Sequence, residues 1–494
     1  MDKKETCCIK VNLPGGVISA GDLYELLLIA ENAGAQAIRI GNRQQLFFCI
    51  DANQLEDLEM DMLRAEISYE INEDEFPNII SSYVTDSIFN TESWIKEGVY
   101  KDIFDLFNFK PKLKINLVDQ HQTFVPFFSG NFNFITSPVS NYWYLYIRFP
   151  KTTDIYCWPS LVYSDDIPTL SQIAEKVIMN HQTLFYDRKK IDHQKFHALI
   201  IAQNDFVDQP ITEPLKLPDF QLPYYEGFNR YVNNKYWLGI YRRNELFAID
   251  FMKDICTICL KNRIGQVYTT PWKSLLIKGI SETNRKDWGI ILNKYRINVR
   301  HASNELNWQL ENLNNESLEL KQQLVREFEE HDLRTYRLCF AIKMHPKTGL
   351  PGSVMIKKRG LGVFDILHTR DFNPNAKDDV IYKQKVPVVD LGQCLIELCN
   401  YFYGILIDDS VVLSVAETEA EEKADKESQP VYQCKNCFSI YDQTYGDTLN
   451  SIAPGVNFEL LADYLCPVCE SPKDSFIRIE NGVTNTNRTI YHII

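Results

Sequence analysis

Two pairs of closely spaced cysteines near the end of the chain restrict its fold more than any other feature. Cys434 and Cys437 form one Cys-x2-Cys pair, Cys466 and Cys469 form the other, and 28 residues separate the two pairs. Such a pair folds as a tight turn with both thiolates on one side, and two turns together supply four sulfurs in a tetrahedron. The sequence therefore predicts a small module around one metal ion. Spacing alone leaves zinc and mononuclear iron as alternatives, because both accept four thiolates.

The remaining cysteines favour metal binding over disulfides as the explanation of these pairs. The chain has 13 cysteines in 494 residues, and its first residues lack the apolar core of a signal peptide. It also lacks an apolar run of 18 residues, so we expect a cytoplasmic protein without a membrane span. Disulfides are rare in that compartment. Cys256 and Cys259, and likewise Cys394 and Cys399, fall in helical patterns, where we expect buried thiols.

Composition and charge argue against a disordered chain and against a nucleic-acid-binding protein. Apolar residues make up 45% of the chain and charged residues 24%, which is typical of a folded globular protein. The length predicts about three domains. The net charge of −14 argues against nucleic-acid binding, because a phosphate backbone selects a basic surface.

An acidic stretch separates the cysteine module from the rest of the chain. Residues 414–430 contain six carboxylates and two lysines. We expect this segment to be a flexible, self-repelling tether that lets the module move.

Two segments before the tether have the same plan and predict a repeated body. The first, Val11–Ile50, has a Pro-Gly-Gly turn, a helix that begins after Ser19, and two strands joined by a turn, with Arg39 and Arg43 flanking Gly41. The second, Tyr236–Ile280, repeats this order, and an ungapped alignment places Arg39 on Tyr268, Arg43 on Trp272 and Gln44 on Lys273. A long mixed region of helices and strands follows each segment.

We therefore expect an α+β protein with seven consecutive parts. Two half-domains (1–75 and 224–283) each precede a companion region (76–223 and 284–413), and the linker (414–430), the cysteine module (431–480) and a tail (481–494) complete the chain.

The residues between the cysteine pairs carry a specific resemblance. The module resembles rubredoxin, the one-iron electron carrier, over about 431–479, in Tyr441-Asp442, Gly446-Asp447, Pro454-Gly455, Phe458-Glu459, Cys466-Pro467, Lys473 and Phe476. The resemblance implies one Fe(3+)/Fe(2+) ion held by Cys434, Cys437, Cys466 and Cys469. With all four positions occupied by protein, such an ion transfers one electron and cannot bind a substrate.

Two positions depart from the rubredoxin pattern. The family usually has glycine after the second cysteine of each pair, where this chain has Phe438 and Glu470. We expect N–H to sulfur bonds to be lost or bent there and, as a result, a lower redox potential than in other members.

The body carries a second resemblance. Residues 12–48, with the Pro-Gly-Gly turn and the Arg-x-x-x-Arg-Gln strand, resemble the ferredoxin-like half-domain of sirohaem-dependent sulfite and nitrite reductases, and the segment ending VYTTPWKSLLIKGI is similar to the partner half-domain. In that family, arginines at the positions of Arg39 and Arg43 lie near the macrocycle and substrate. The resemblance implies that these two bind an anion or a sirohaem-like ligand. The alternative is a pair of strand-end arginines that face solvent or local carboxylates.

Those reductases also hold a four-iron cluster with two cysteine pairs, the first with five intervening residues and the second with three. Neither spacing occurs among the cysteines outside the module. We therefore expect no iron–sulfur cluster and the loss of reductase chemistry, and we assign no catalytic residue.

The two resemblances together imply an electron carrier that serves nitrite or sulfite assimilation. Its module, with seven acids and three bases, predicts a redox partner with a basic docking face. Two alternatives stay open, an active sirohaem reductase and a scaffold stapled by zinc.

Overall fold

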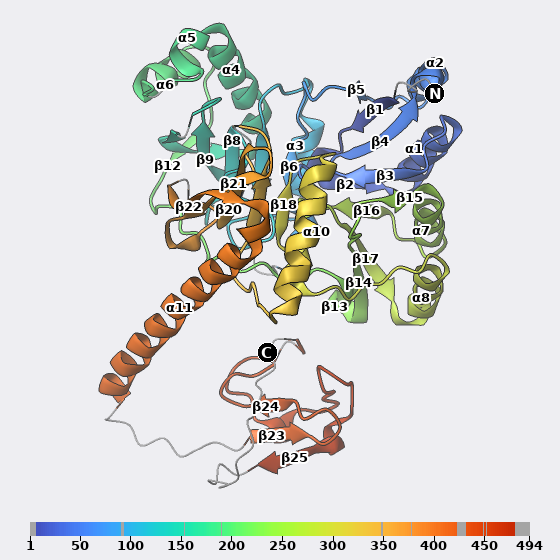
Figure 1. Cartoon of the computed structure of the whole chain (residues 1–494), viewed down its shortest axis with the longest axis vertical. Helices are drawn as coiled ribbons and strands as arrows, with labels where there is room; N and C mark the ends of the chain where they lie inside the picture. Colours follow the sequence, from blue (N-terminus) through green and yellow to red (C-terminus); the bar gives the residue numbers. More distant parts are fainter. Residues whose placement is uncertain are drawn as a thin grey trace. The chain divides into compact units, whose positions relative to one another are not determined.

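The computed structural model describes residues 6–89, 93–152, 154–188, 190–346, 349–376, 378–421, 431–447, 449–450 and 452–479. The chain divides into two compact units, Met1–Gly404 and Ile405–Ile494 (Figure 1). Each unit is described by itself. The tail predicted at 481–494 lies outside the described residues.

The first repeat folds as the sequence predicts. Its elements are β1 (Thr6–Val11), β2 (Val17–Ser19), α1 (Ala20–Asn32), β3 (Ala37–Ile40), β4 (Leu46–Asp51) and α2 (Leu55–Arg64). The Ser19 hydroxyl accepts a hydrogen bond from the Asp22 backbone N–H at 3.0 Å, which caps α1. The predicted apolar face of this helix is buried.

The second repeat reproduces this order. It comprises β14 (Lys235–Ile240), β15 (Phe247–Ala248), α7 (Ile249–Lys261), β16 (Gln266–Thr269), β17 (Leu275–Ser281) and α8 (Arg285–Lys294). The ungapped alignment of the two repeats pairs residues that occupy equivalent positions in two turns, the one before β4 and the one before β17. Gln44 and Lys273 both have positive φ, 65° and 55°. Hydrogen bonds from Gly41 N to Gln45 O (2.8 Å) and from Thr270 N to Ser274 O (3.0 Å) close the two turns alike.

The two repeats exchange edge strands. β15 of the second repeat pairs with β3 of the first, and β2 of the first pairs with β16 of the second. The resulting sheets have the orders β15-β3-β4-β1-β5 and β2-β16-β17-β14-β13, with β5 at Glu70–Ile71 and β13 at Gly227–Tyr231. Helices α2, α1, α7 and α8 line one side of the unit (Figure 1), and both repeats share one hydrophobic core. Each sheet therefore needs both repeats to be complete.

The companion regions also share a plan. The first has the sheet order β12-β11-β9-β8-β7-β6, with β10 paired to β9. Its strands are β6 (Ile80–Ser81), β7 (Ile115–Val118), β8 (Phe132–Thr136), β9 (Tyr142–Arg148), β10 (Ile155–Cys157), β11 (Ser160–Tyr163) and β12 (Asp208–Pro210). Its helices are α3 (Glu97–Asp105), α4 (Ile167–Asn180), α5 (Gln182–Phe185) and α6 (His193–Ile201).

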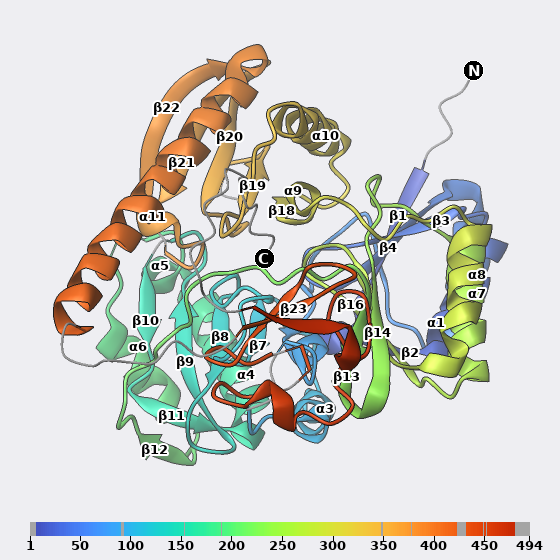
Figure 2. The ribbon, with the colours of Figure 1, turned by 90° about the horizontal axis from the view of Figure 1, so that it is seen from below.

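The second companion region has the sheet order β18-β19-β20-β21-β22. Its elements are α9 (Ser303–Leu306), β18 (Trp308–Leu310), α10 (Asn315–Glu330), β19 (Phe340–Lys343), β20 (Val354–Gly360), β21 (Val363–Thr369), β22 (Asp379–Pro387) and α11 (Leu391–Glu421). In both regions the first three strands are parallel and the later strands antiparallel. The start of α11 runs alongside β21 and β22 (Figure 2). The α+β class is confirmed, with a repeat that extends over both companion regions.

The flexible-coil prediction for residues 414–430 is wrong in its first part, because α11 continues to Glu421. Alanine and glutamate are good helix formers, and no glycine or proline precedes Pro430 in this stretch, so an existing helix extends into it. The rest of the predicted tether, 422–430, lies outside the described residues.

The C-terminal unit contains a small sheet of order β24-β23-β25, formed by β23 (Val431–Cys434), β24 (Ile440–Asp442) and β25 (Phe476–Ile479). Four aromatic side chains form its core: Tyr432, Tyr441, Phe458 and Tyr464. The Lys473 ammonium donates to the carbonyls of Glu459 and Leu461 at 2.9 and 2.8 Å and ties the long loop between the cysteine pairs to the second pair. A core this small depends on its metal for stability.

Candidate metal centre

The four predicted cysteines converge on one point. Their Sγ atoms all lie within 4.8 Å of one another. Two contacts join the pairs, Cys434 to Cys469 at 3.6 Å and Cys437 to Cys466 at 3.3 Å. A tetrahedral site with metal–sulfur bonds of about 2.3 Å places its sulfurs about 3.8 Å apart. The donor set therefore fits one metal ion with four thiolate ligands and no open position.

Backbone N–H groups point at these sulfurs. The Cys434 thiol accepts from the N–H groups of Asn436 and Cys437, and although burial acts against it, the pKa of Cys434 is lowered. The Ser471 hydroxyl and N–H both lower the pKa of Cys469. These donors favour thiolate, which is the form that a metal binds.

The positions that depart from the rubredoxin pattern keep its backbone conformation. Phe438 and Glu470 have φ of 63° and 57°, in the left-handed region that glycine usually occupies. Their N–H groups donate to the carbonyls of Cys434 and Cys466, both at 2.9 Å. The next N–H groups along the chain, of Ser439 and Ser471, still donate to the second sulfur of each pair. The expected loss of N–H to sulfur bonds is therefore wrong at both turns, because the fold imposes the conformation on a non-glycine residue.

Two serine hydroxyls next to the sulfurs were missed by the sequence reasoning. Ser439 Oγ lies 2.9 Å from Cys466 Sγ and 3.3 Å from Cys437 Sγ. Ser471 Oγ lies 3.0 Å from Cys469 Sγ and accepts from the Asn436 side-chain amide at 2.8 Å. A serine two residues after the second cysteine of each pair was the available signal.

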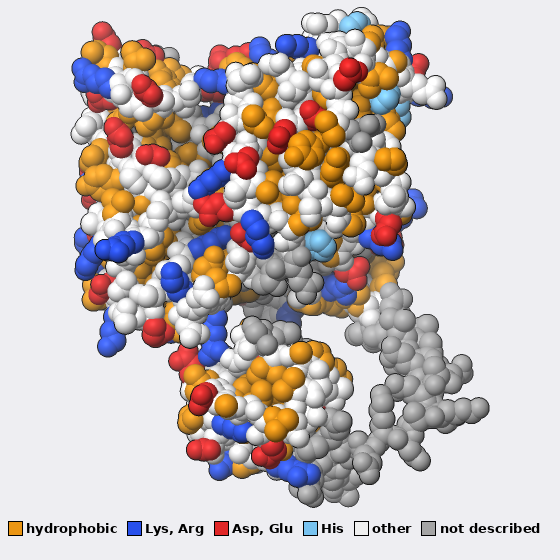
Figure 3. Space-filling view, turned by 180° about the vertical axis from the view of Figure 1, so that it is seen from behind, with side chains coloured by type: hydrophobic (Ala, Val, Ile, Leu, Met, Phe, Trp, Pro, Cys, Tyr) orange, Lys and Arg blue, Asp and Glu red, His pale blue; other side chains and the backbone are white. Residues whose placement is uncertain are grey.

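The surface of this unit is partly apolar. Hydrophobic side chains gather on one of its faces (Figure 3). Phe438 and Val468, within the two cysteine turns, are 69% and 68% exposed. A partner that docks near the turns would therefore meet apolar side chains beside the metal ligands.

Arg43, predicted to bind an anionic ligand, is buried in the body. Its guanidinium donates to the carbonyls of Asn78 (2.7 Å) and Ile115 (3.0 Å) and to the side chain of Asn116 (3.3 Å). Burial lowers the pKa of Arg43 to about 9. Its side chain also lines a cavity of about 380 Å³.

Arg39 has different partners. Its Nη2 donates to the Asn315 side chain at 3.2 Å, at the start of α10. Its charge acts on the thiols of Cys8 and Cys49. The structure thus gives the two predicted arginines separate protein partners, and their role toward an anion stays a prediction.

A second, strongly basic cavity of about 610 Å³ lies in the same unit and shares lining residues with the cavity at Arg43. We call it the basic cavity; among the described residues its lining includes Lys114, Arg148, Lys151, Lys343, Lys357, Lys358 and Arg359, together with His345 and the acid Asp379. Burial lowers the pKa of Lys114 and of Lys343 to about 8. The run Lys357-Lys358-Arg359 was the sequence signal, and it was not recognised because Lys114, Arg148 and Lys151, which complete the cavity, lie more than two hundred residues away.

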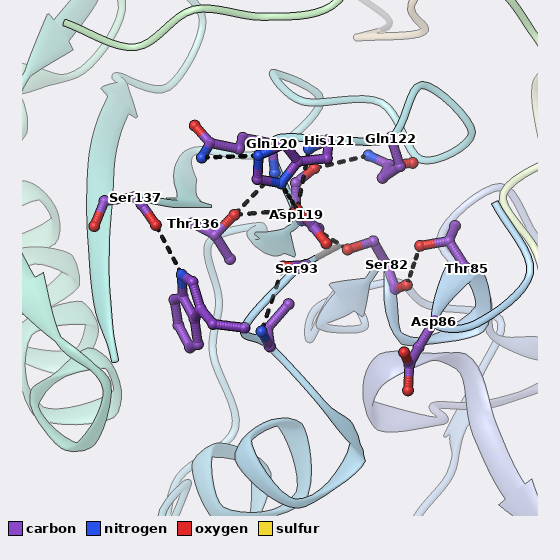
Figure 4. A network of polar contacts seen from close by, with 12 residues as sticks. Ser82, Thr85, Asp86, Ser93, Asp119, Gln120, His121, Gln122, Thr136 and Ser137 are labelled. Atoms are coloured by element: carbon purple, nitrogen blue, oxygen red, sulfur yellow. Dashed lines mark hydrogen bonds and ion pairs between the residues drawn. The ribbon is translucent and has the colours of Figure 1, made fainter. Parts of the chain in front are cut away.

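A polar cluster occupies the carboxyl ends of parallel strands β6, β7 and β8 (Figure 4). Asp119, directly after β7, accepts from the His121 backbone N–H at 3.0 Å and lies 3.3 Å from the Thr136 hydroxyl. The Asp119 N–H donates to the Ser82 hydroxyl at 2.7 Å. These bonds join the loops that follow the three strands and hold the exposed His121 ring against a buried carboxylate at 3.1 Å.

Comparisons with known proteins identify both parts of the chain. The rubredoxin family model matches residues 431–476, and the model of the nitrite/sulfite reductase ferredoxin-like half domain matches residues 1–65. The metal module is thus a rubredoxin-type iron-binding module joined to a nitrite/sulfite reductase-like body. Through residues 431–476 the chain belongs to the rubredoxin family.

Relatives of this module are rubredoxins. The rubredoxin of Megasphaera elsdenii is 42% identical over 50 residues, which are 10% of this chain and 94% of that protein. Rubredoxin-1 of Chlorobaculum tepidum is 38% identical over 58 residues, 12% of this chain and 84% of that protein. The high molecular weight rubredoxin of Moorella thermoacetica is 43% identical over 53 residues, 10% of this chain, and the match spans 23% of that longer protein.

The body has a known fold. The structure of the NirA protein of Mycobacterium tuberculosis superposes with a TM-score of 0.60 at 14% identity, over 79% of this chain and 80% of that one. At this identity the match establishes the fold and nothing further. In the described part of the chain, none of the helices has the length and apolarity that crossing a bilayer requires.

Proposed function

We propose that this protein transfers single electrons through the Fe(Cys)4 site of its rubredoxin module and serves nitrite or sulfite assimilation. The observation that carries the proposal is the convergence of four thiolates within 4.8 Å in a rubredoxin fold. Because protein sulfurs fill every position, the ion can cycle between ferric and ferrous states without binding a substrate. The half-domain match of the body supports the assimilatory role.

The body acts without an iron–sulfur cluster in this proposal. Within the described residues, only the four module cysteines form a group of at least three potential ligand side chains that lie close enough together to hold one metal ion. Burial raises the pKa of Cys256 to about 12, and that of Cys259 is also raised, so both behave as core thiols on α7. In this proposal the body docks or holds a redox partner and delegates electron transfer to the module.

The partner that we propose carries a basic docking face. Seven acids and three bases in residues 431–480 attract such a surface, and apolar Phe438 and Val468 can then make the short-range contact. Such encounters weaken with ionic strength, so the rate of electron transfer should fall several-fold between about 50 and 300 mM salt. A rate independent of salt would contradict a charged docking face.

The basic cavity favours a second candidate, a body that retains sirohaem. Sirohaem is a polycarboxylate macrocycle, and the lysines and arginines that line this cavity have the chemistry to bind several carboxylates. When bound, sirohaem would supply an iron for reducing an oxyanion. In this candidate Arg148 and Lys343 orient carboxylates, and Arg43 faces the adjoining cavity.

One preparation tests both candidates. Protein purified anaerobically after expression with iron and haem precursors should contain one iron, show thiolate-to-iron absorption that bleaches on reduction, and titrate as a one-electron couple. Cys437→Ser should alter this spectrum, while Cys157→Ser, in the body, should not. Zinc alone after reconstitution with iron would refute the electron carrier. A haem-like band in the same sample would establish the sirohaem candidate, and its absence would dismiss it.

A further inference from the structure

Cys8 and Cys49 face each other across two neighbouring strands. In the antiparallel register of β1 and β4, Cys8 lies directly opposite Cys49. The Cys8 N–H donates to the Asn72 side chain and the Cys8 carbonyl accepts from the Asn72 N–H, both at 2.8 Å. Both backbone groups of Cys8 therefore point away from β4, which makes Cys8 and Cys49 a non-hydrogen-bonded pair.

This kind of pair has the geometry of a disulfide. Opposite residues in a non-hydrogen-bonded pair have Cα atoms about 4.5 Å apart and side chains on the same face. Disulfides span Cα separations of about 4.4 to 6.8 Å. Both thiols are free, they interact with each other, and Cys49 is exposed. A sulfur–sulfur bond can thus form without moving the strands.

The surroundings divide the two thiols into a nucleophile and a proton donor. The hydrogen bond from Cys8, helped by the charge of Arg39, lowers the pKa of Cys49 to about 6, and Cys49 is also the more exposed of the two thiols, which favours it as the attacking thiolate. The hydrogen bond with Cys49 raises the pKa of Cys8, and burial raises it further, so Cys8 keeps its proton. Arg39, on β3, pairs with Phe47 on β4. Phe47 lies two residues before Cys49 on the same strand, so the side chains of Arg39, Phe47 and Cys49 share one face of the sheet.

Other cysteines of the body lack this combination. Cys256 and Cys259 are buried on one helix and have raised pKa values. Cys157 is exposed, and burial of its sulfur raises its pKa. The contrast separates Cys8 and Cys49 from thiols that only fill space.

We propose that Cys8 and Cys49 form a second redox site, a dithiol that is oxidised to a disulfide by low-molecular-weight disulfides of the glutathione class. The Cys49 thiolate attacks one sulfur of the external disulfide, and the other sulfur leaves as a thiolate. The Cys8 sulfur then attacks Cys49 in the mixed disulfide, while the Cys8 proton goes to the second leaving sulfur. One external disulfide becomes one external thiolate and one external thiol, and the protein loses two electrons and one proton from its thiol–thiolate pair.

The site differs from the iron centre in electron count and in reactant. The iron couple carries one electron, whereas the dithiol exchanges two with a sulfur compound. Oxidation would link β1 to β4 covalently in the sheet that receives β15 from the second repeat. The dithiol thus gives the body a response to the thiol–disulfide balance that does not depend on the iron module.

The test uses the full-length, iron-loaded protein with oxidised and reduced glutathione at fixed ratios. Peptide mapping by mass spectrometry should find a Cys8–Cys49 cross-link, with loss of two hydrogens, as the ratio becomes oxidising. Cys8→Ser should trap glutathione on Cys49, because the resolving thiol is gone. Cys49→Ser should lose both the cross-link and the adduct, and Cys157→Ser should leave the cross-link unchanged.

Two results would overturn the proposal. The first is that Cys8 and Cys49 stay reduced at ratios that oxidise a control dithiol of thioredoxin type. The second is that Cys8→Ser gives no adduct on Cys49 although its iron absorption shows a folded module and its circular dichroism matches that of the parent protein. Iron content read in the same samples separates both results from a failure of the electron-transfer function.

Discussion

The serine hydroxyls at the metal site lie directly against the ligand sulfurs. Ser439 and Ser471 stand two residues after the second cysteine of each pair, and each oxygen lies within 3.3 Å of a ligand sulfur. A hydroxyl that donates to a thiolate stabilises the more negative, ferrous state more than the ferric state. Together with the N–H donors that the turns retain, these hydroxyls act against the low potential expected from the sequence.

We predict that Ser439→Ala and Ser471→Ala each lower the reduction potential of the iron. If the lost bond favours the ferrous state by about 0.7 to 1.4 kcal/mol, the shift is about 30 to 60 mV for a one-electron couple. Redox titration of the optical bands measures it. Thr444→Ala, an exposed position in the same unit, is the control and should leave the potential unchanged. Unchanged potentials in both serine variants would show that the hydroxyls donate elsewhere.

Two half-buried lysines make the basic cavity sensitive to pH. The folded-state pKa of Lys114 and of Lys343 is about 8, because burial disfavours the charged form. Each side chain is cationic below that pH and loses its proton as the pH rises through it. The cavity therefore holds its largest positive charge below pH 8.

We predict that an octacarboxylate porphyrin, used as a probe of the cavity, binds more weakly as the pH rises from about 7 to 9, by several-fold for each lysine that loses its charge. Fluorescence titration of the probe measures this affinity. Lys343→Gln should weaken binding at pH 7 and flatten the pH profile, whereas Lys261→Gln, on exposed α7 surface, should do neither. A profile that rises with pH would contradict the assignment.

The Pro14-Gly15-Gly16 turn is the element that joins the first half-domain to its companion region. Gly15 has φ of 69°, and a Cβ atom at this position would overlap the ring of Phe104, in the last turn of α3. The Gly15 N–H donates to the Ile79 carbonyl at 2.8 Å, beside β6. The glycine is required here by both the backbone conformation and the close approach.

We predict that Gly15→Ala destabilises the body by about 2 to 4 kcal/mol, from a left-handed non-glycine residue plus a steric overlap in a packed region. Gly34→Ala is a matched control, because Gly34 also has positive φ, 84°, but its Cβ would enter open space. Its loss should be about 1 kcal/mol. Urea unfolding followed by tryptophan fluorescence compares the two, and equal losses would show that the Phe104 contact relaxes freely.

The exchange of edge strands makes the two repeats one cooperative body. β15, from the second repeat, completes the sheet of the first, and its Phe247 side chain is fully buried in the shared core. Stability of one repeat therefore depends on residues about two hundred positions away. Each half-domain together with its companion region forms one copy of the structural repeat. The exact boundaries between these parts stay predictions.

We predict that Phe247→Ala costs about 3 to 5 kcal/mol and reduces hydrogen-exchange protection in β3 and β4 as well as in its own repeat. Hydrogen exchange read by mass spectrometry resolves the strands. Leu260→Ala, at a side chain that is 54% exposed on α7, should change stability by less than about 0.5 kcal/mol. Loss of protection confined to β14, β16 and β17 would mean that the repeats unfold independently.

The parts of this architecture that local sequence signals specify could be predicted, and the parts that depend on short strands or distant residues could not. Ser19, the apolar spacing after it and the turn at Gly41 are local signals, and they place α1, β3 and β4 correctly. The exchanged strands β2 and β15 are only three and two residues long, too short for a periodic signal. The basic cavity draws its cations from four separate stretches of the chain, so no local pattern reveals it.

By itself, the sequence determined the metal site, because four cysteines in two Cys-x2-Cys turns bring their own geometry, and it determined the repeat, because both copies keep the same order of local signals. Only the tertiary structure decided how Arg39, Arg43, Cys8 and Cys49 are used. Arg43 is buried against carbonyls, and Arg39 lies beside a thiol pair, since strand register and long-range packing choose the neighbours of a side chain. Such neighbours are set by residues far apart along the chain, and no window of sequence contains them.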